Sequence, residues 1–229
     1  MVFGKAMVAA LGCLPQWSVK PVAFKYVAGD DLDAAIRVVK NLNGRGITAT
    51  VDVLGESATN EQYVRDSVRD YKALIDAIVT GKQQSGVSIK PTAFGLAFDE
   101  ALAVEAMREV IFHARSGNVF VRVDMGNSPY TSKTIELYHR YRAEHARVGV
   151  VLQAYLKRTL ADIEALPQGC DLRLCKGIYV EPAEIAHKDY QAVRDNYVLC
   201  LRKILERGHR VGIATHDLYL IGAAKRLLQ

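Results

Sequence analysis

Two cations interrupt an apolar, strand-like stretch near the C-terminal end of the sequence, LRLCKGIY at residues 172–179. The cations are Arg173 and Lys176. A charge in a buried strand loses its hydration, which costs several kcal/mol unless the charge is paired. Two cations at such a place therefore indicate an anion to be bound, or a reaction in which negative charge develops.

Further polar residues stand where other predicted strands end. They are Glu56, Lys90, Asp124, Gln153, Thr215 and His216. Taken alone, each of these residues has an ordinary structural explanation. Lys90 could be a surface lysine on an edge strand, Asp124 a helix cap and His216 a histidine packed in the core. Together they predict one functional site, because the carboxyl ends of parallel strands share a face and chemistry in barrels is built there.

The elements that must position these residues alternate regularly along the chain. Strands are predicted at 47–56, 86–96, 118–125, 148–155, 171–179 and 209–217. Helices are predicted at 31–45, 60–81, 98–117, 128–146, 159–166, 188–208 and 218–229, with Ser128 as the cap of the helix at 128–146. This alternation indicates parallel strands joined by helical crossovers.

Two architectures fit that alternation, an open doubly wound sheet and a closed barrel. The sequence has no GxGxxG after its first strand, as a dinucleotide-binding doubly wound sheet normally would. We therefore predict an α/β fold of the TIM-barrel, (βα)8 type, with about six βα units in this chain and the last two missing. The predicted division is an N-terminal helical segment at 1–45 and an incomplete barrel at 46–229. Residues 1–17 are expected to form a helix that packs on the fold.

Composition narrows the class of protein. Half of the 229 residues are hydrophobic. The net charge is +5, but the basic residues are interspersed with acidic ones, which argues against a nucleic-acid partner. The cysteines, Cys13, Cys170, Cys175 and Cys200, form no CxxC, and no HExxH occurs. We expect reduced thiols, a cytoplasmic location and no metal.

Seven segments occur in an order and at spacings that resemble the proline dehydrogenase family: YVAGDDLDAAIRVV, VDVLGE, SIKPTAFGL, VRVDM, VVLQAYLKRT, LRLCKGIYVEP and IATHD. The resemblance runs from about residue 24 to the last residue. It implies a distorted barrel with non-covalent FAD across the strand ends. The implied reaction oxidises L-proline to Δ1-pyrroline-5-carboxylate, with a quinone-type electron acceptor and peripheral membrane association.

The same resemblance assigns residues to roles. It implies that Arg173 lies near the reacting edge of the flavin, that Asp124 is an active-site carboxylate, and that Lys90 pairs with the substrate carboxylate. The implied flavin contacts are Met125, Gln153, Lys176, Gly177, Ile178, Thr215 and His216, with Arg158 as a weaker candidate. A regular strand would point Arg173 and Lys176 to opposite faces, unless Gly177 relaxes the geometry.

Two departures from the family pattern affect what we expect. Gly126 and Asn127 follow Met125 where the family commonly has an acid, so a softer loop is expected there. The seventh and eighth units and a Tyr-x-x-Arg-Arg motif have no match here, which predicts poor FAD binding by this chain without a complementing C-terminal segment. The alternatives are an inactive fragment, half of a split enzyme, or a barrel aldolase with Lys90 or Lys176 as a Schiff-base lysine.

Overall fold

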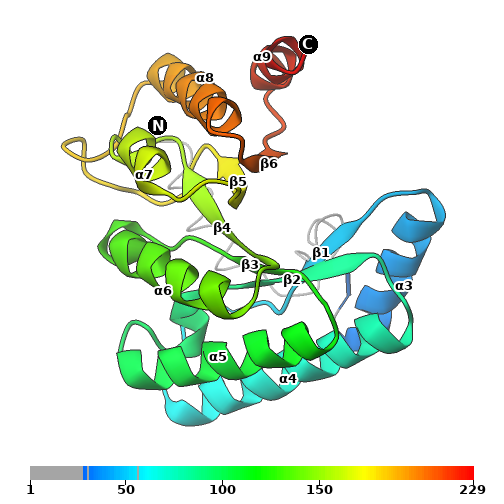
Figure 1. The fold of residues 1–229 in the computed structure, drawn as a ribbon. Coiled ribbons are helices and arrows are strands. Elements are labelled where there is room, and N and C mark those ends of the chain that lie inside the picture. The colour runs from blue at the N-terminus through cyan, green and yellow to red at the C-terminus, as the bar shows by residue number, and fades with distance from the viewer. Residues whose placement is uncertain (1–27, 30, 56) are drawn as a thin grey trace, which may run out of the picture.

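A parallel sheet of six strands organises the computed structural model, which describes residues 28–29, 31–55 and 57–229. Each strand pairs with the next along the chain, so the order is β1-β2-β3-β4-β5-β6. The sheet curls as a barrel wall does (Figure 1). The strands are β1 Ala49–Asp52, β2 Ser85–Ile89, β3 Val121–Val123, β4 Val148–Gln153, β5 Asp171–Cys175 and β6 Arg210–Ala214. The predicted α/β barrel type and its six units are confirmed.

Helices follow the strands and cover the outer face of the sheet (Figure 1). They are α3 Leu32–Gly44, α4 Glu61–Thr80, α5 Glu100–Ser116, α6 Thr131–Glu144, α7 Thr159–Ala165, α8 Tyr190–Glu206 and α9 Leu218–Leu227. Two short 3-10 helices, η1 Pro91–Phe94 and η2 Ser128–Tyr130, follow β2 and β3. Five α-helices, α3, α4, α5, α8 and α9, begin at an Asp or Asn whose side chain accepts a backbone N–H, the usual N-cap. Within the described part of the chain, no helix is long and apolar enough to cross a bilayer.

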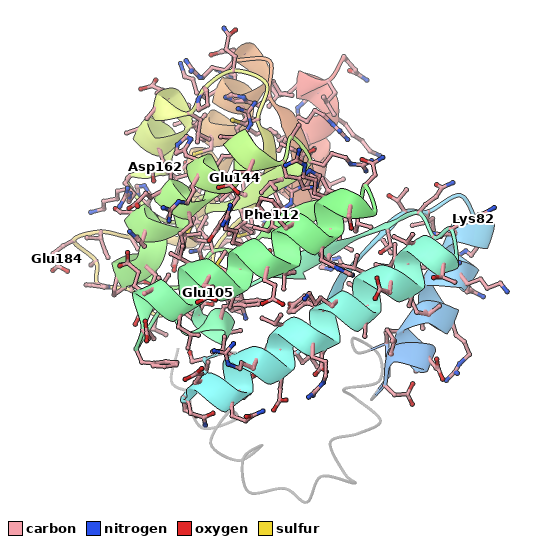
Figure 2. The ribbon with its side chains drawn as sticks, turned by 60° about the horizontal axis from the view of Figure 1, so that its bottom comes forward. Lys82, Glu105, Phe112, Glu144, Asp162 and Glu184 are labelled. Carbon is pink, nitrogen blue, oxygen red and sulfur yellow. The ribbon has the colours of Figure 1, made fainter. Side chains whose placement is uncertain are left out.

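The hydrophobic core lies between the sheet and these helices. Alternate strand residues point into it, including Val87, Ile89, Val121 and Val123, and all four are fully buried. The outward faces of the helices carry charged side chains such as Glu105 and Glu144 (Figure 2). Because successive residues of a strand point to opposite faces of the sheet, the residues between these core positions lie on the concave face.

A buried ion pair occupies the concave face near the amino ends of the strands. Arg122 Nη2 lies 2.5 Å from Asp171 Oδ1, and Arg122 Nη1 donates to the Asp171 carbonyl at 2.9 Å. The pair lines a cavity of about 880 Å³ at this end of the sheet. Burial alone would lower the pKa of Arg122, and the carboxylate of Asp171 offsets part of that effect. Arg122 therefore serves the interior of the fold, at the end opposite to the predicted site.

Several strands end earlier than the sequence predicts. β2 ends at Ile89, and Pro91 starts η1 instead of extending the strand to residue 96. β5 ends at Cys175, so Lys176 lies beyond the strand. Strand alternation therefore does not force Lys176 away from Arg173, and the conflict expected between them does not arise.

The predicted helix cap at Ser128 is wrong. Ser128 starts η2, and α6 begins only at Thr131. The Ser128 N–H and hydroxyl both donate to the carboxylate of Glu181, at 2.7 and 2.6 Å. The Ser128 hydroxyl thus donates to a distant acid, whereas a capping hydroxyl would accept a helix N–H.

The two outer strands of the sheet, β1 and β6, are its open edges among the described residues. Inward-facing residues on both strands are exposed, among them Thr50, Asp52, Gly212 and Ala214. On the inner strands, the equivalent positions Ser88 and Gln153 are buried. The helix expected at 1–17 and the strand-end residue Glu56 lie outside the described residues.

Candidate functional site

Asp124 and Arg173 form an ion pair on the concave face at the carboxyl ends of β3 and β5. Arg173 Nη1 lies 3.1 Å from Asp124 Oδ1, and the Ser88 hydroxyl donates to the same oxygen at 3.2 Å. Both side chains of the pair stay partly exposed. The charges are therefore fixed by protein groups and still accessible to a ligand, which suits a preorganised electrostatic site.

The electrostatic surroundings of Asp124 include Lys90, which follows β2. Burial raises the pKa of Asp124 above its usual value, although the charge of Arg173, the hydrogen bond from Ser88 and the charge of Lys90 offset part of that increase. Ile89 pairs with Val123 in the sheet, so Lys90 and Asp124 follow partner residues and the charge of Lys90 acts on this carboxyl from the neighbouring strand. Lys90, Asp124 and Arg173 thus form one group, hereafter the charged cluster.

Gln153 and Met125 lie buried beside this cluster. Gln153, at the end of β4, is 3% exposed, and its Nε2 donates to the Gly126 carbonyl at 2.8 Å. Thr159 in turn donates to the Gln153 carbonyl at 2.6 Å. The loop after Met125, expected to be softer because of Gly126, is therefore fastened to β4 at this residue.

A second group of predicted residues lies at the ends of β5 and β6. Lys176 Nζ lies 3.4 Å from Asp217 Oδ2, and the side chain of Ile178 stands largely in solvent, with 85% of the residue exposed. Thr215 accepts the Asp217 N–H at 3.1 Å, and His216 is exposed. The predicted cofactor contacts are thus divided between the charged cluster and this group.

Asp217 is the centre of the second group, and sequence reasoning missed it. Its carboxylate, 2% exposed, accepts from Arg194 Nε and Nη2 at 2.9 and 2.8 Å and from the Tyr190 hydroxyl at 2.8 Å. These hydrogen bonds hold the pKa of Asp217 well below its usual range, and the one from Arg194 has the largest effect. It also caps α9 by accepting the Tyr219 N–H. An Asp directly before a predicted helix was the available signal.

Arg158, the weaker candidate, is used elsewhere. Its guanidinium pairs with Asp162 Oδ2 at 2.8 Å and donates to the Ser132 hydroxyl at 2.8 Å. Both partners lie on neighbouring outer helices, α7 and α6. These contacts account for Arg158 as a residue of the helical surface.

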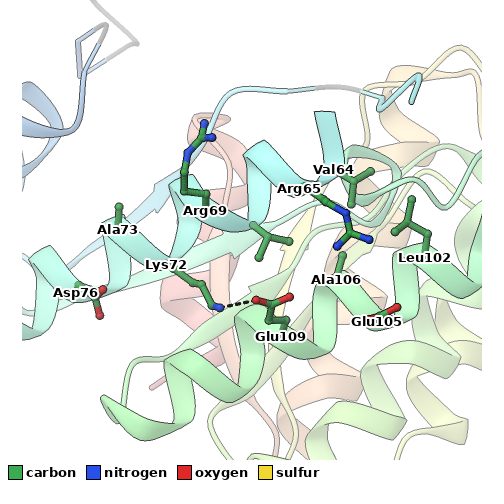
Figure 3. Close-up of a pocket in the computed structure, with 11 residues that line it drawn as sticks. Val64, Arg65, Arg69, Lys72, Ala73, Asp76, Leu102, Glu105, Ala106 and Glu109 are labelled. Carbon is green, nitrogen blue, oxygen red and sulfur yellow. Dashed lines mark hydrogen bonds and ion pairs between the residues drawn. The ribbon is translucent and has the colours of Figure 1, made fainter. Parts of the chain in front are cut away.

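A groove between α4 and α5 lies on the outer surface, away from the strand ends (Figure 3). Its volume is about 490 Å³, and Lys72 and Glu109 form an ion pair across it. The residues that line it belong to the two helices alone. Because it contains none of the predicted site residues, we place the functional site on the concave face.

Gly177 offers a test of the local backbone. Its φ is +113°, and a Cβ built there would lie 2.1 Å from the Tyr155 ring. Gly177→Ala should therefore destabilise the fold by about 1–3 kcal/mol more than Gly208→Ala does, through steric overlap. Gly208 is the matched control, because its φ is +69° and a Cβ there would meet nothing within 4 Å. Denaturant unfolding measures the free energy of unfolding of both variants. Equal losses of stability would contradict the steric overlap at Gly177.

Comparison with known sequences identifies the family. The model of the family described as "Proline dehydrogenase" matches residues 35–229. Proline dehydrogenase 2 of Bacillus subtilis (strain 168) is 34% identical over 212 residues, covering 92% of this chain and 70% of the relative. The proline dehydrogenase of Deinococcus radiodurans is 32% identical over 215 residues, covering 90% of this chain and 69% of the relative. The family predicted from the sequence is confirmed.

Solved structures share the fold. Proline utilization A from Bdellovibrio bacteriovorus, inactivated by N-propargylglycine, superposes with a TM-score of 0.82 at 23% identity. Proline utilization A from Corynebacterium freiburgense gives a TM-score of 0.77 at 21% identity. Each match covers 92% of this chain and about a quarter of the larger protein, 27% and 25%.

Proposed function

Because the chain belongs to the proline dehydrogenase family, we propose that its concave face oxidises L-proline to Δ1-pyrroline-5-carboxylate with non-covalent FAD. The observation that carries the proposal is the charged cluster on the concave face, in which Lys90 and Asp124 directly follow β2 and β3 and Arg173 lies on β5. When bound, FAD would supply the oxidising chemistry, namely acceptance of the hydride lost from the ring carbon beside the proline nitrogen.

The side chains at the ends of β5 and β6 fit such a cofactor. FAD combines a flat aromatic ring system with a diphosphate, so it needs apolar surface and cations together. Ile178 offers exposed apolar surface beside the partly exposed ammonium of Lys176. Gly177 between them has a positive φ, and the Tyr155 ring occupies the place where a side chain would stand. Lys176, Gly177 and Ile178 are therefore the residues that would hold the phosphate-bearing part.

The charged cluster divides the remaining work. The ammonium of Lys90 is a compact charge that suits the carboxylate of an amino acid. The guanidinium of Arg173 is held by Asp124 and stabilises negative charge that develops during the reaction. Asp124 positions that guanidinium, and Ser88 in turn positions Asp124.

The Schiff-base alternative has less support. A lysine must lose its proton to attack a carbonyl carbon. Lys176 Nζ lies 3.4 Å from Asp217 Oδ2, so its ammonium already has a carboxylate partner. The charge of Lys90 acts on two carboxyl groups, those of Asp52 and Asp124, so this lysine also belongs to a set of opposite charges.

The proposal extends to partners. A quinone-type acceptor would take the electrons, and the protein would be cytoplasmic with peripheral association to a membrane. The net charge of +5 supports contact with an anionic surface. A complementing βα segment would pair with the open edges of β1 and β6, since an unpaired strand edge readily accepts another strand.

The test is flavin retention and proline-dependent dye reduction. The chain is mixed with FAD, alone and with a complementing βα segment from a relative, and is separated from free flavin. We expect at least one of the two preparations to retain flavin and to reduce the dye with L-proline. That preparation is hereafter called the active form. Absence of flavin retention and of dye reduction from both preparations would overturn the proposal. Borohydride trapping of a keto substrate on a lysine would favour the aldolase instead.

A further inference from the structure

A carboxyl group that the predicted site did not include lies at the end of β1. Asp52 is the last residue of that strand and stands opposite Ser88 of β2 in the strand register. As a residue it is exposed, because β1 is an edge strand, but its Oδ1 lies 2.8 Å from the hydroxyl of the buried Tyr71. Asp52 thus lies on the concave face and contacts a buried side chain of α4.

The hydroxyl of Tyr71 can adapt to two protonation states of Asp52. Besides Asp52 Oδ1, it lies 2.6 Å from the Ser88 carbonyl and accepts the Val53 N–H at 3.3 Å. The hydroxyl has one hydrogen, and the carbonyl can only accept. When Asp52 is ionised, the hydrogen can go to its carboxylate. When Asp52 is protonated, it can donate to the Tyr71 oxygen while Tyr71 donates to Ser88.

The charged groups that face Asp52 are Lys90, Asp124 and Arg173, besides the hydroxyl of Tyr71. Burial and the negative charge of Asp124 raise the pKa of Asp52, while the Tyr71 hydrogen bond, Lys90 and Arg173 lower it, with a net increase. Burial raises the pKa of Tyr71 as well, so its hydroxyl stays neutral. Asp52 is therefore a better proton acceptor than an ordinary aspartate and stays close to the charged cluster.

We infer that Asp52, held by Tyr71, accepts the proton that the ammonium nitrogen of the bound amino acid must lose. The inference rests on the proposed function. The N–H bond breaks, an O–H bond forms on Asp52, and the electron pair stays on nitrogen. That lone pair then supports loss of hydride from the neighbouring carbon, which a charged ammonium cannot do. The pKa of Asp124 is raised as well, but Arg173 and Ser88 already engage its ionised form, so Asp124 is less suited.

Asp52→Asn tests the step in the active form of the enzyme. Asn keeps an oxygen that accepts from Tyr71 and removes the basic group. We expect kcat/KM for L-proline to fall by about 10²-fold, the usual contribution of a general base. The remaining acid limb should move to lower pH, because Asp124 loses a neighbouring negative charge.

Tyr71→Phe should shift the same limb in the opposite direction. The hydrogen bond from Tyr71 lowers the pKa of Asp52, so its loss raises that pKa. Because Asp52 must be ionised to accept a proton, kcat/KM should then begin to fall at higher pH than in the wild type. This variant also decides the matter if Asp52→Asn fails to fold.

A binding measurement separates proton transfer from mere positioning. A five-membered ring carboxylic acid with oxygen in place of the N–H offers Asp52 no proton. Asp52→Asn should bind this analogue with the affinity of the wild type. Weaker binding of the analogue by Asp52→Asn would overturn the inference and leave the proposed function standing. An unchanged acid limb in Tyr71→Phe would do the same. A wild type that leaves L-proline unoxidised would overturn the proposed function and the inference together.

Discussion

Replacement of Arg173 by Ala should lower kcat by about 10²–10³-fold, the cost of removing one group that stabilises charge in a transition state. KM for L-proline should change much less. The guanidinium is fixed by Asp124 at 3.1 Å and is still partly exposed, so it needs no reorganisation when negative charge develops. An interaction that grows along the reaction affects turnover, whereas uniform binding affects KM.

Rapid anaerobic mixing of the variant with L-proline measures the reduction step directly. Arg158→Ala is the matched control, because Arg158 also pairs with an aspartate but on the helical surface. It should reduce at the wild-type rate. Arg173→Ala should also raise the pKa of Asp124, since the charge of Arg173 lowers it. A variant that lost affinity and kept its rate would reverse the roles given to Arg173 and Lys90.

Replacement of Lys90 by Ala should raise KM by about 10- to 100-fold and change kcat little. A hydrogen bond to a charged group contributes about 1.5–3 kcal/mol, and each 1.4 kcal/mol is about tenfold in affinity. The carboxylate of the substrate carries its charge before and during the reaction, so the loss falls on binding. Lys72→Ala is the control, because Lys72 pairs with Glu109 on the outer surface. Equal effects of the two substitutions would remove Lys90 from the substrate site.

Much of the fold followed from periodicity in the sequence. Alternating strands and helices predicted parallel strands joined by helical crossovers, and the structure has both. Strand ends were less predictable. Pro91 and Lys176 sit in β-prone surroundings, but a 3-10 helix and a glycine with positive φ end the strands before them. Backbone hydrogen bonds to other strands decide such boundaries, and a single segment does not reveal them.

The site was predictable where a residue carries its own signal, as the charges of Lys90, Asp124 and Arg173 do. Asp217 and Asp52 were missed because their importance depends on partners far away in the sequence. Arg194 and Tyr190 come from α8, and Tyr71 comes from α4. Cross-element contacts of this kind appear only once the chain is folded.

The central claim is that the concave face holds FAD and passes a hydride to it from proline. The most direct test is anaerobic absorbance of the flavin-loaded active form, before and after L-proline is added. The account predicts bleaching of the visible flavin band with L-proline, little change with the oxygen analogue, and strongly slowed bleaching in Arg173→Ala. Retained flavin whose spectrum is unchanged by L-proline would contradict the claim.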